Sequence, residues 1–201
     1  MAPSPASLPP AGSAELALSI ERAYREAAVL ERLEALWALI LAKCFLLQWA
    51  IDAYALPVRG LVYVWTLTFA MAAFASFLYL RAHRVTLRLL PWHTRVSGAL
   101  LAGLLVALAA LAYAQGALGA LAPAITAGLA CVLLGGWSLA RAALGRTPEA
   151  FGGALAWWGL GWVAAHDGDG RALLWVGSGW LLAQALPGFA RLARRRREQR
   201  A

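Results

Sequence analysis

The sequence predicts an all-α fold: a polytopic membrane protein whose six-helix transmembrane bundle is preceded by a short amphipathic cytoplasmic helix. Of the 201 residues, 62% are hydrophobic and only 14% are charged, whereas soluble domains average about 45–50% apolar and about 25% charged residues. The stretches 97–114, 118–140 and 172–190 contain no Asp, Glu, Lys or Arg. A water-soluble core of this size cannot bury so much apolar surface, whereas helices of about 20 apolar residues fit the bilayer.

The N-terminal part of the chain divides into a tail and a helix. Residues 1–12 are rich in Pro, Ala and Ser, and we expect a disordered tail there. Over residues 13–35 apolar side chains recur every three or four positions and charges fill the remaining positions, which indicates an amphipathic cytoplasmic or interfacial helix. This helix either lies on the membrane surface and leads into the first span, or it docks onto a partner protein.

The transmembrane domain is expected to occupy residues 36–190. Its six spans are predicted at residues 36–56, 61–80, 97–114, 124–140, 151–166 and 172–190. The fifth span is short, because its residues reach only about 24 Å at the helical rise of about 1.5 Å per residue. A basic cytoplasmic tail, residues 191–201, follows the sixth span.

The arginines predict the orientation of the bundle. An even number of spans places fifteen arginines on the side of the two termini, including those of segments 81–95 and 191–200, and leaves Arg59 and Arg171 on the other side. Lys and Arg are retained on the cytoplasmic face during insertion. We therefore expect the bacterial cytoplasmic (inner) membrane, with the N-terminus and the C-terminus both in the cytoplasm.

Polar residues of the first span are candidates for a ligand site. Ionisable groups inside a span are costly, so Lys43 and Asp52 each need a physical reason. One interpretation is that both side chains reach the nearest membrane surface. The other is that the span faces a polar interior, where Gln48 and Asp52 contribute to a site for a substrate, an ion or a proton.

The tryptophans are a second candidate site. The chain has 10 tryptophans, and anchoring at the membrane interfaces accounts for many of them. Alternatively, a cluster in the last two spans lines an aromatic pocket suited to a flat or cationic ligand. This cluster comprises Trp157, Trp158, Trp162, Trp175 and Trp180.

The sequence shows no pattern typical of a metal, cofactor or catalytic site. The segment HDGDG at 166–170 lacks the further ligands of a calcium loop, so it predicts a hydrated turn. Cys44 and Cys131 lie in predicted spans and are expected to be small core residues. No nucleophile with an adjacent base is recognisable, so we predict that the protein is not an enzyme and that it has no catalytic residue, metal or cofactor.

The length, the six predicted spans and the cytoplasmic termini give the chain a resemblance to one family. In these features it resembles the substrate-binding subunits of energy-coupling-factor vitamin transporters, some of which hold a ligand with aromatic side chains in the membrane. No diagnostic motif of that family is present, and the charged helix at 13–35 departs from its compact form. The resemblance therefore implies a fold and leaves the function open.

The expected partners follow from the same features. They are the lipid bilayer, a possible protein partner at residues 13–35, and anionic lipid at Arg194, Arg195, Arg196 and Arg197. The arginines lie between and beyond apolar segments, so no nucleic acid is expected. The leading hypothesis is a small protein of transport or permease type with an intramembrane polar or aromatic site. The alternative is a non-transporting regulatory, assembly or anchoring subunit of a membrane complex.

Overall fold

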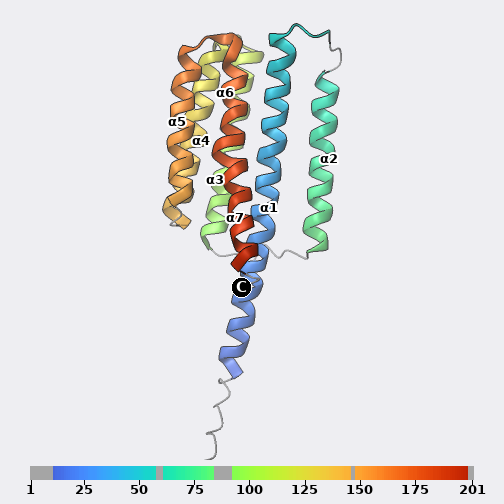
Figure 1. Cartoon of the computed structure of the whole chain (residues 1–201), viewed down its shortest axis with the longest axis vertical. Helices are drawn as coiled ribbons and strands as arrows, with labels where there is room; N and C mark the ends of the chain where they lie inside the picture. Colours follow the sequence, from blue (N-terminus) through green and yellow to red (C-terminus); the bar gives the residue numbers. More distant parts are fainter. Residues whose placement is uncertain (1–10, 58–60, 84–91, 146–147, 199–201) are drawn as a thin grey trace, which may run out of the picture.

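The fold was determined as a computed structural model, which describes residues 11–57, 61–83, 92–145 and 148–198. The regular elements of these residues are all helical (Figure 1). Five α-helices come first, and a single 3-10 turn, η2 (Asp169–Arg171), separates them from a last rod made of α6, the π-helical segment η3 and α7. Their bounds are α1 (Ala11–Ala53), α2 (Leu61–Ala82), α3 (Trp92–Gly116), α4 (Pro123–Gly145), α5 (Pro148–His166), α6 (Ala172–Gly179), η3 (Trp180–Ala185) and α7 (Leu186–Glu198).

Within the described residues, five helices are long and apolar enough to cross a membrane, so the protein is an integral, multi-pass membrane protein in contact with the bilayer. These candidate spans are Ala28–Ala53, Tyr63–Ala82, Arg95–Gly116, Pro123–Leu144 and Ala172–Arg194. The prediction of a six-span bundle is therefore confirmed for five helices only. The predicted fifth span does form a helix, α5, but glycine and tryptophan occupy many of its positions and it is not among the five.

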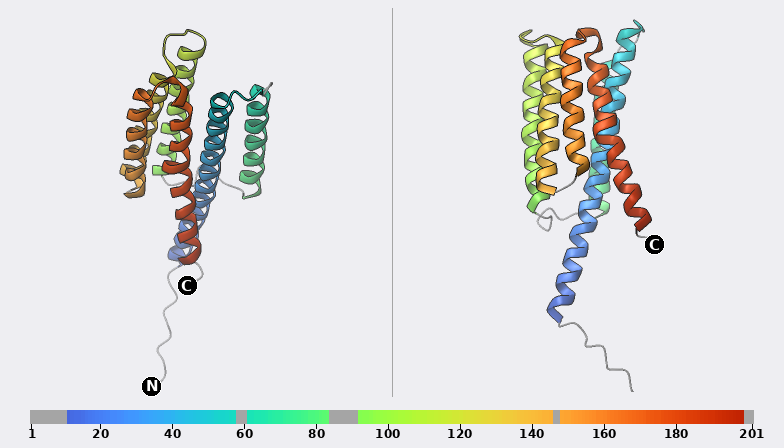
Figure 2. Two further views of the ribbon diagram at one scale, coloured as in Figure 1. Left: turned by 45° about the horizontal axis from the view of Figure 1, so that its top comes forward. Right: turned by 60° about the vertical axis from the view of Figure 1, so that its left-hand side comes forward.

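The predicted amphipathic helix and the predicted first span are one helix. We expected a boundary between residues 35 and 36, but α1 continues through it without interruption. Neither Gly nor Pro, the residues that most often end a helix, occurs between Ser13 and Ala53. The N-terminal part of α1 therefore projects beyond the other helices (Figure 2).

Small residues bring the helices of the core close together. A Cβ atom added to Gly161 of α5 would lie 2.8 Å from Cys131 Cβ of α4, and one added to Gly179 would lie 2.3 Å from Trp157 Cζ3. Trp157, Leu134 and Cys131 are fully buried between these helices. Close approach at glycines is typical of packing inside a membrane, where association depends on van der Waals contact.

Helix α2 lies at the edge of the bundle beside α1 (Figure 1). Aromatic contacts join the two helices: Trp37 stacks on Phe69 with ring centroids 6.0 Å apart, and Phe45 meets Trp65 edge-on at 5.4 Å. The remaining face of α2 is apolar and exposed, as expected for a helix surrounded by lipid.

The arginines gather at one end of the bundle, where α2 ends, α3 begins, and α4 and α7 end (Figure 1). We call this the arginine-rich end; its described arginines include Arg81, Arg95, Arg141, Arg191 and Arg194. Arg171 lies at the opposite end, in the turn between α5 and α6. The described arginines are therefore distributed unequally between the two ends.

Candidate functional site

The structure pairs the two polar candidates of the first span with each other. Gln48 Nε2 donates hydrogen bonds to both carboxylate oxygens of Asp52, each at 3.1 Å, one turn apart on α1. Asp52 is exposed and lies one residue before the end of α1, at the end of the bundle opposite the arginines. Lys43, half-way along the candidate span, is also exposed.

The five candidate tryptophans have different surroundings. Only Trp157 and Trp180 meet, edge to face, with ring centroids 5.5 Å apart. Trp158 donates from Nε1 to the carbonyl oxygen of Val132 at 3.3 Å, and Trp162 is 70% exposed. Trp175, in the first turn of α6, donates from Nε1 to Asp167 in the turn that precedes this helix. The structure therefore brings two of the five indoles together in the core and leaves three with separate neighbours.

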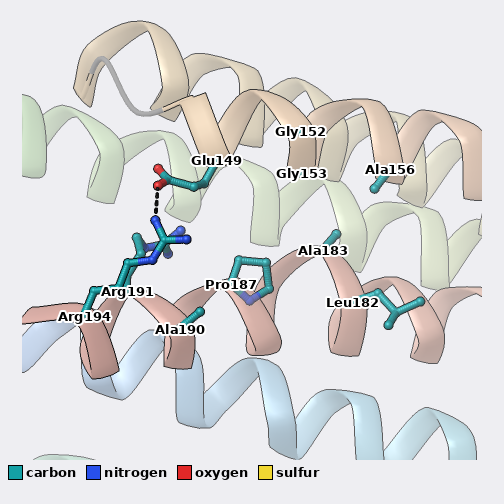
Figure 3. A pocket seen from close by; sticks show the side chains of 10 residues that line it. All are labelled: Glu149, Gly152, Gly153, Ala156, Leu182, Ala183, Pro187, Ala190, Arg191 and Arg194. Carbon is teal, nitrogen blue, oxygen red and sulfur yellow. Dashed lines mark hydrogen bonds and ion pairs between the residues drawn. The ribbon is translucent and has the colours of Figure 1, made fainter.

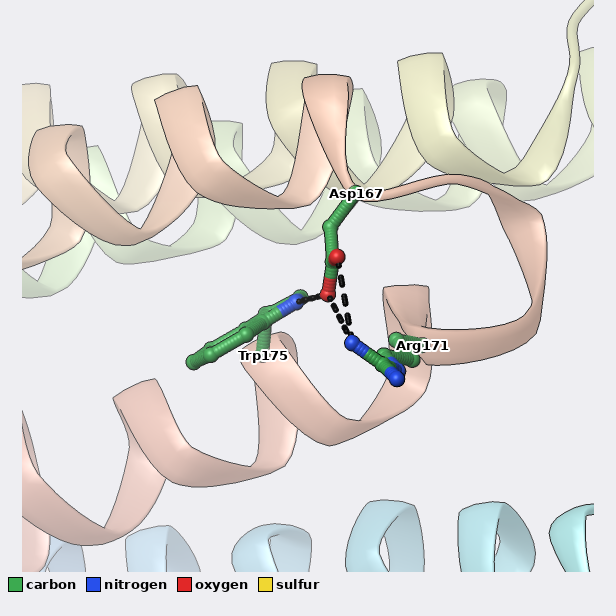
Figure 4. A network of polar contacts seen from close by, with 3 residues as sticks. All are labelled: Asp167, Arg171 and Trp175. Carbon is green, nitrogen blue, oxygen red and sulfur yellow. Dashed lines mark hydrogen bonds and ion pairs between the residues drawn. The ribbon is translucent and has the colours of Figure 1, made fainter.

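The turn at 166–170 is held by hydrogen bonds within the protein (Figure 4). Asp167 accepts hydrogen bonds from Trp175 Nε1 at 2.9 Å and from Arg171 Nη1 at 3.3 Å. Gly168 adopts a φ of +88°, which favours glycine. Among the described residues, no group of three or more His, Cys, Asp or Glu side chains is placed to hold a metal ion.

A polar cluster that the sequence did not single out lies towards the arginine-rich end. Glu34 of α1 forms an ion pair with Arg141 of α4, and the two side chains are 30% and 20% exposed. The guanidinium of Arg141 also lies 4.9 Å from the ring centroid of Trp137, a cation–π distance. These contacts join two helices whose charged residues are far apart in sequence.

A second polar contact joins α4 to the π-helical segment η3. Gln184 Nε2 donates to Ser138 Oγ at 2.8 Å, and both side chains are buried. Buried polar groups inside a membrane are costly unless paired, and they commonly face a cavity or a pathway. A single π-helical turn within a longer helix is also frequent at functional sites.

Two adjoining cavities open beside this cluster, and we call them together the polar cleft. The smaller cavity, about 70 Å³, is bordered by charged and polar side chains that include Glu31, Ser138, Arg141 and Gln184. The larger one, about 360 Å³, runs between α5 on one side and η3 and α7 on the other (Figure 3). Both are lined by Glu149, Gly153, Ala183 and Arg191.

The two ends of the polar cleft differ. At the arginine-rich end Arg194 Nη1 lies 3.4 Å from Glu149 Oε1, so an exposed ion pair borders the larger cavity there (Figure 3). At the other end Trp157, one helical turn beyond Gly153, packs against Gly179 and Trp180. The cleft is therefore flanked by an ion pair at the arginine-rich end and by packed aromatic side chains towards the opposite end.

The polar cleft extends into the apolar part of the bundle. Ser138 precedes the end of the candidate span at Leu144 by six residues, which corresponds to about 9 Å at the helical rise of about 1.5 Å per residue. Gln184 precedes Arg194, the end of its own candidate span, by ten residues. Hydrogen-bonding groups are thus present at a depth where lipid supplies none.

Only some residues of the polar cleft and its neighbouring ion pair could have been recognised from the sequence. Gln184 is the single amide in the uncharged run 172–190, and that isolation was a usable signal. Glu34 and Arg141 had none, because each occurs among other charged residues at the edge of an apolar segment. No protein-family model matches the chain, and neither a curated protein nor a solved structure is detectably similar to it.

Proposed function

We propose that the protein is a small permease-type transporter that admits a polar solute from its arginine-rich end. The polar cleft is the observation that carries this proposal. It places the amide of Gln184 and the hydroxyl of Ser138 beside a cavity that is also bordered by Glu149 and Arg191. Intramembrane polar groups that border a cavity are typical of substrate and ion pathways.

The proposal includes a sixth crossing by α5. Helix α4 finishes at the arginine-rich end, whereas α6 begins at the opposite end, and α5 runs between them beside α4 (Figure 1). If α4 and α6 cross the bilayer, the chain must cross it again between them. With six crossings, the positive-inside rule assigns the arginine-rich end and both termini to the cytoplasm of a bacterial cell.

The lining of the cleft favours a small zwitterionic solute. Glu149 and Arg191 border both cavities and supply charges of opposite sign, and Gln184 adds an amide. Gly152, Gly153, Ala156 and Ala183 leave space between them because their side chains are small or absent. An amino-acid-like molecule, with one ammonium and one carboxylate group, complements this arrangement.

The aromatic pair beyond the cleft provides a gate in this proposal. Trp157 closes the path towards the opposite end, and Trp180, which packs against it, is the first residue of the π-helical segment. A shift of this segment to regular α-helical geometry would rotate Trp180 relative to Gln184. Local helix adjustments of this kind are an established way to alternate between two packed states.

Binding and counterflow test the proposal directly. We would screen the purified protein by thermal shift against the twenty standard amino acids, then measure counterflow of the best ligand in proteoliposomes. Gln184→Leu should lower the ligand-induced shift and the counterflow at least tenfold, whereas Leu118→Ala, a change at an exposed position outside the cleft, should leave both intact. If wild type and Gln184→Leu respond alike to every amino acid and neither shows counterflow, the proposal is wrong.

A second candidate function, a partner-binding subunit, is favoured by the projection of α1. Residues 11–27 precede the candidate span and correspond to roughly 25 Å of helix. Leu18 and Ile20 are exposed there, at 63% and 47%. In this function the projecting helix packs its apolar side chains against a cytoplasmic protein.

In-cell photocrosslinking separates the two functions. A photoreactive amino acid at position 18 should give one discrete protein adduct if the projecting helix has a dedicated partner. The same amino acid at Leu118, which is 62% exposed at the other end of the bundle, serves as the control. Equal adduct patterns from the two positions would argue against a partner at α1.

A further inference from the structure

We propose that a cleft between α1, α2 and α7 is a specific binding site for one anionic phospholipid. This cavity, of about 580 Å³, is separate from the polar cleft and lies at the arginine-rich end. Its described lining consists of Arg32, Leu36, Tyr79, Phe189, Leu192, Ala193 and Arg197. The arginines of the C-terminal tail predict general attraction to anionic lipid, whereas this cleft defines a site between helices.

The polar groups of the cleft suit a phosphate. Two guanidinium groups and one phenol line it, and none of its described lining residues is acidic. Arg32 donates from Nη1 to Tyr79 Oη at 3.5 Å, a long contact, and its Nε is buried without a hydrogen-bond partner in the described part of the chain. Buried donors are normally paired, and a phosphate oxygen is a strong acceptor for arginine.

The order of residues along each helix suits an amphiphile. On α1 the apolar Leu36 lies one turn deeper in the candidate span than Arg32, and on the last rod Phe189 and Leu192 lie deeper than Arg197. The charged groups therefore face the membrane surface and the apolar groups face the hydrocarbon. A free phosphate ion would gain nothing from the apolar wall, whereas the acyl chains of a lipid would cover it.

Next to the cleft, a hydrogen bond joins α1 to α2. Trp37, five residues after Arg32, donates from Nε1 to Ser76 Oγ at 3.0 Å, and Ser76 precedes Tyr79 on α2. Below this contact the two helices are held together by their aromatic side chains. A phospholipid in the cleft would fill the space between α2 and the rest of the bundle on the arginine-rich side.

Native mass spectrometry of the full chain tests the site. The protein would be released from micelles containing phosphatidylglycerol, phosphatidylcholine or inorganic phosphate as the only added ligand. We expect one molecule of phosphatidylglycerol to stay bound to the protein. The bound fraction of phosphatidylcholine should be at least tenfold lower, and no bound phosphate should be detected. Retention of both lipids alike would overturn the proposal, and so would a phosphate ion that displaces phosphatidylglycerol at equal concentration.

Variants separate this site from general attraction to positive charge. Arg32→Gln should weaken phosphatidylglycerol binding about tenfold, as expected for loss of one charge-assisted contact. Arg81→Gln removes an exposed arginine from the same end and should change binding less than twofold. Leu36→Trp fills the apolar part of the cleft and should abolish retention while leaving every arginine in place. Equal losses in Arg32→Gln and Arg81→Gln, or full retention in Leu36→Trp, would contradict the site.

Discussion

Gln184 donates a 2.8 Å hydrogen bond to Ser138 across the contact between η3 and α4, and both side chains are buried. Ser138→Ala would leave the amide of Gln184 without this acceptor. Hydrogen bonds between membrane helices contribute about 0.6 kcal/mol on average and up to about 1.7 kcal/mol. We expect Ser138→Ala to lower the free energy of unfolding in detergent by about 1 kcal/mol.

A double-mutant cycle checks that this loss belongs to the pair. If the contact is the cause, Ser138→Ala should have almost no further effect once Gln184→Leu is present. Additive effects of the two substitutions would show that each side chain is stabilised by other neighbours.

Gly179→Ala tests the packing that closes the polar cleft. The added Cβ atom would lie 2.3 Å from Trp157 Cζ3, and Trp157 is fully buried. Overpacking of a core costs about 1–3 kcal/mol, so the thermal unfolding midpoint in detergent should fall clearly. The matched control is Gly159→Ala on α5, where an added Cβ atom meets nothing within 4 Å.

Gly159→Ala should leave the unfolding midpoint unchanged or raise it slightly, because alanine favours a helix over glycine by about 0.5–1 kcal/mol. Equal destabilisation by the two substitutions would show that loss of glycine, and not contact with Trp157, is responsible.

The two tryptophans of α5 with opposite exposure should respond differently to truncation. Trp157 is 0% exposed and Trp162 is 70% exposed. Trp157→Ala would leave a core cavity, which costs about 3–5 kcal/mol for a large aromatic side chain. Trp162→Ala should change the free energy of unfolding by less than about 0.5 kcal/mol. Comparable losses of unfolding free energy in Trp157→Ala and Trp162→Ala would contradict the assignment of Trp157 to the core.

The ion pair of Glu34 and Arg141 should be coupled more strongly than that of Glu149 and Arg194. The first pair is largely covered, at 30% and 20% exposure, whereas the second is 38% and 71% exposed. Exposed pairs are worth about 0.2–1 kcal/mol, and we expect about 1–2 kcal/mol for the covered pair, between exposed and fully buried cases. Double-mutant cycles that combine the Glu→Gln and Arg→Gln substitutions of each pair, with the free energy of unfolding as the readout, measure the two coupling energies.

Salt provides the control for this comparison. The coupling of Glu149 with Arg194 should fall as ionic strength rises, because solvent ions screen exposed charges. The coupling of Glu34 with Arg141 should change less. A reversed order of the two couplings would mean that the covered pair is not stabilising.

The sequence predicted the helices well because apolar runs between charges mark bilayer-spanning segments directly. The second span was expected at 61–80 and is observed as α2, Leu61–Ala82. The helix expected at 13–35 and the span expected at 36–56 form one continuous helix, α1, in which Arg32 and Glu34 contact other helices of the bundle. Arg141 and Tyr79, their partners in the bundle, come from distant segments of the chain.

The candidate site was less predictable because its residues also come from distant segments of the chain. The five tryptophans were expected to form one cluster because they are near one another in sequence. A helix turns about 100° per residue, so Trp158 and Trp162 face away from Trp157 and Trp180. Gln184 meets Ser138 through a contact between residues 46 positions apart. Such pairs follow from helix packing, which no local pattern specifies.

Thiol labelling at Ala183 tests the central proposal, that a solute reaches the polar cleft from the arginine-rich end. Ala183 lines both cavities, and Cys44 and Cys131, both buried, would first be replaced by alanine. In oriented membrane vesicles, Ala183→Cys should react with a membrane-impermeant reagent from the side of the arginine-rich end, and Leu118→Cys from the opposite side. Reaction of Ala183→Cys from the side that labels Leu118→Cys, or from neither side, would contradict the account.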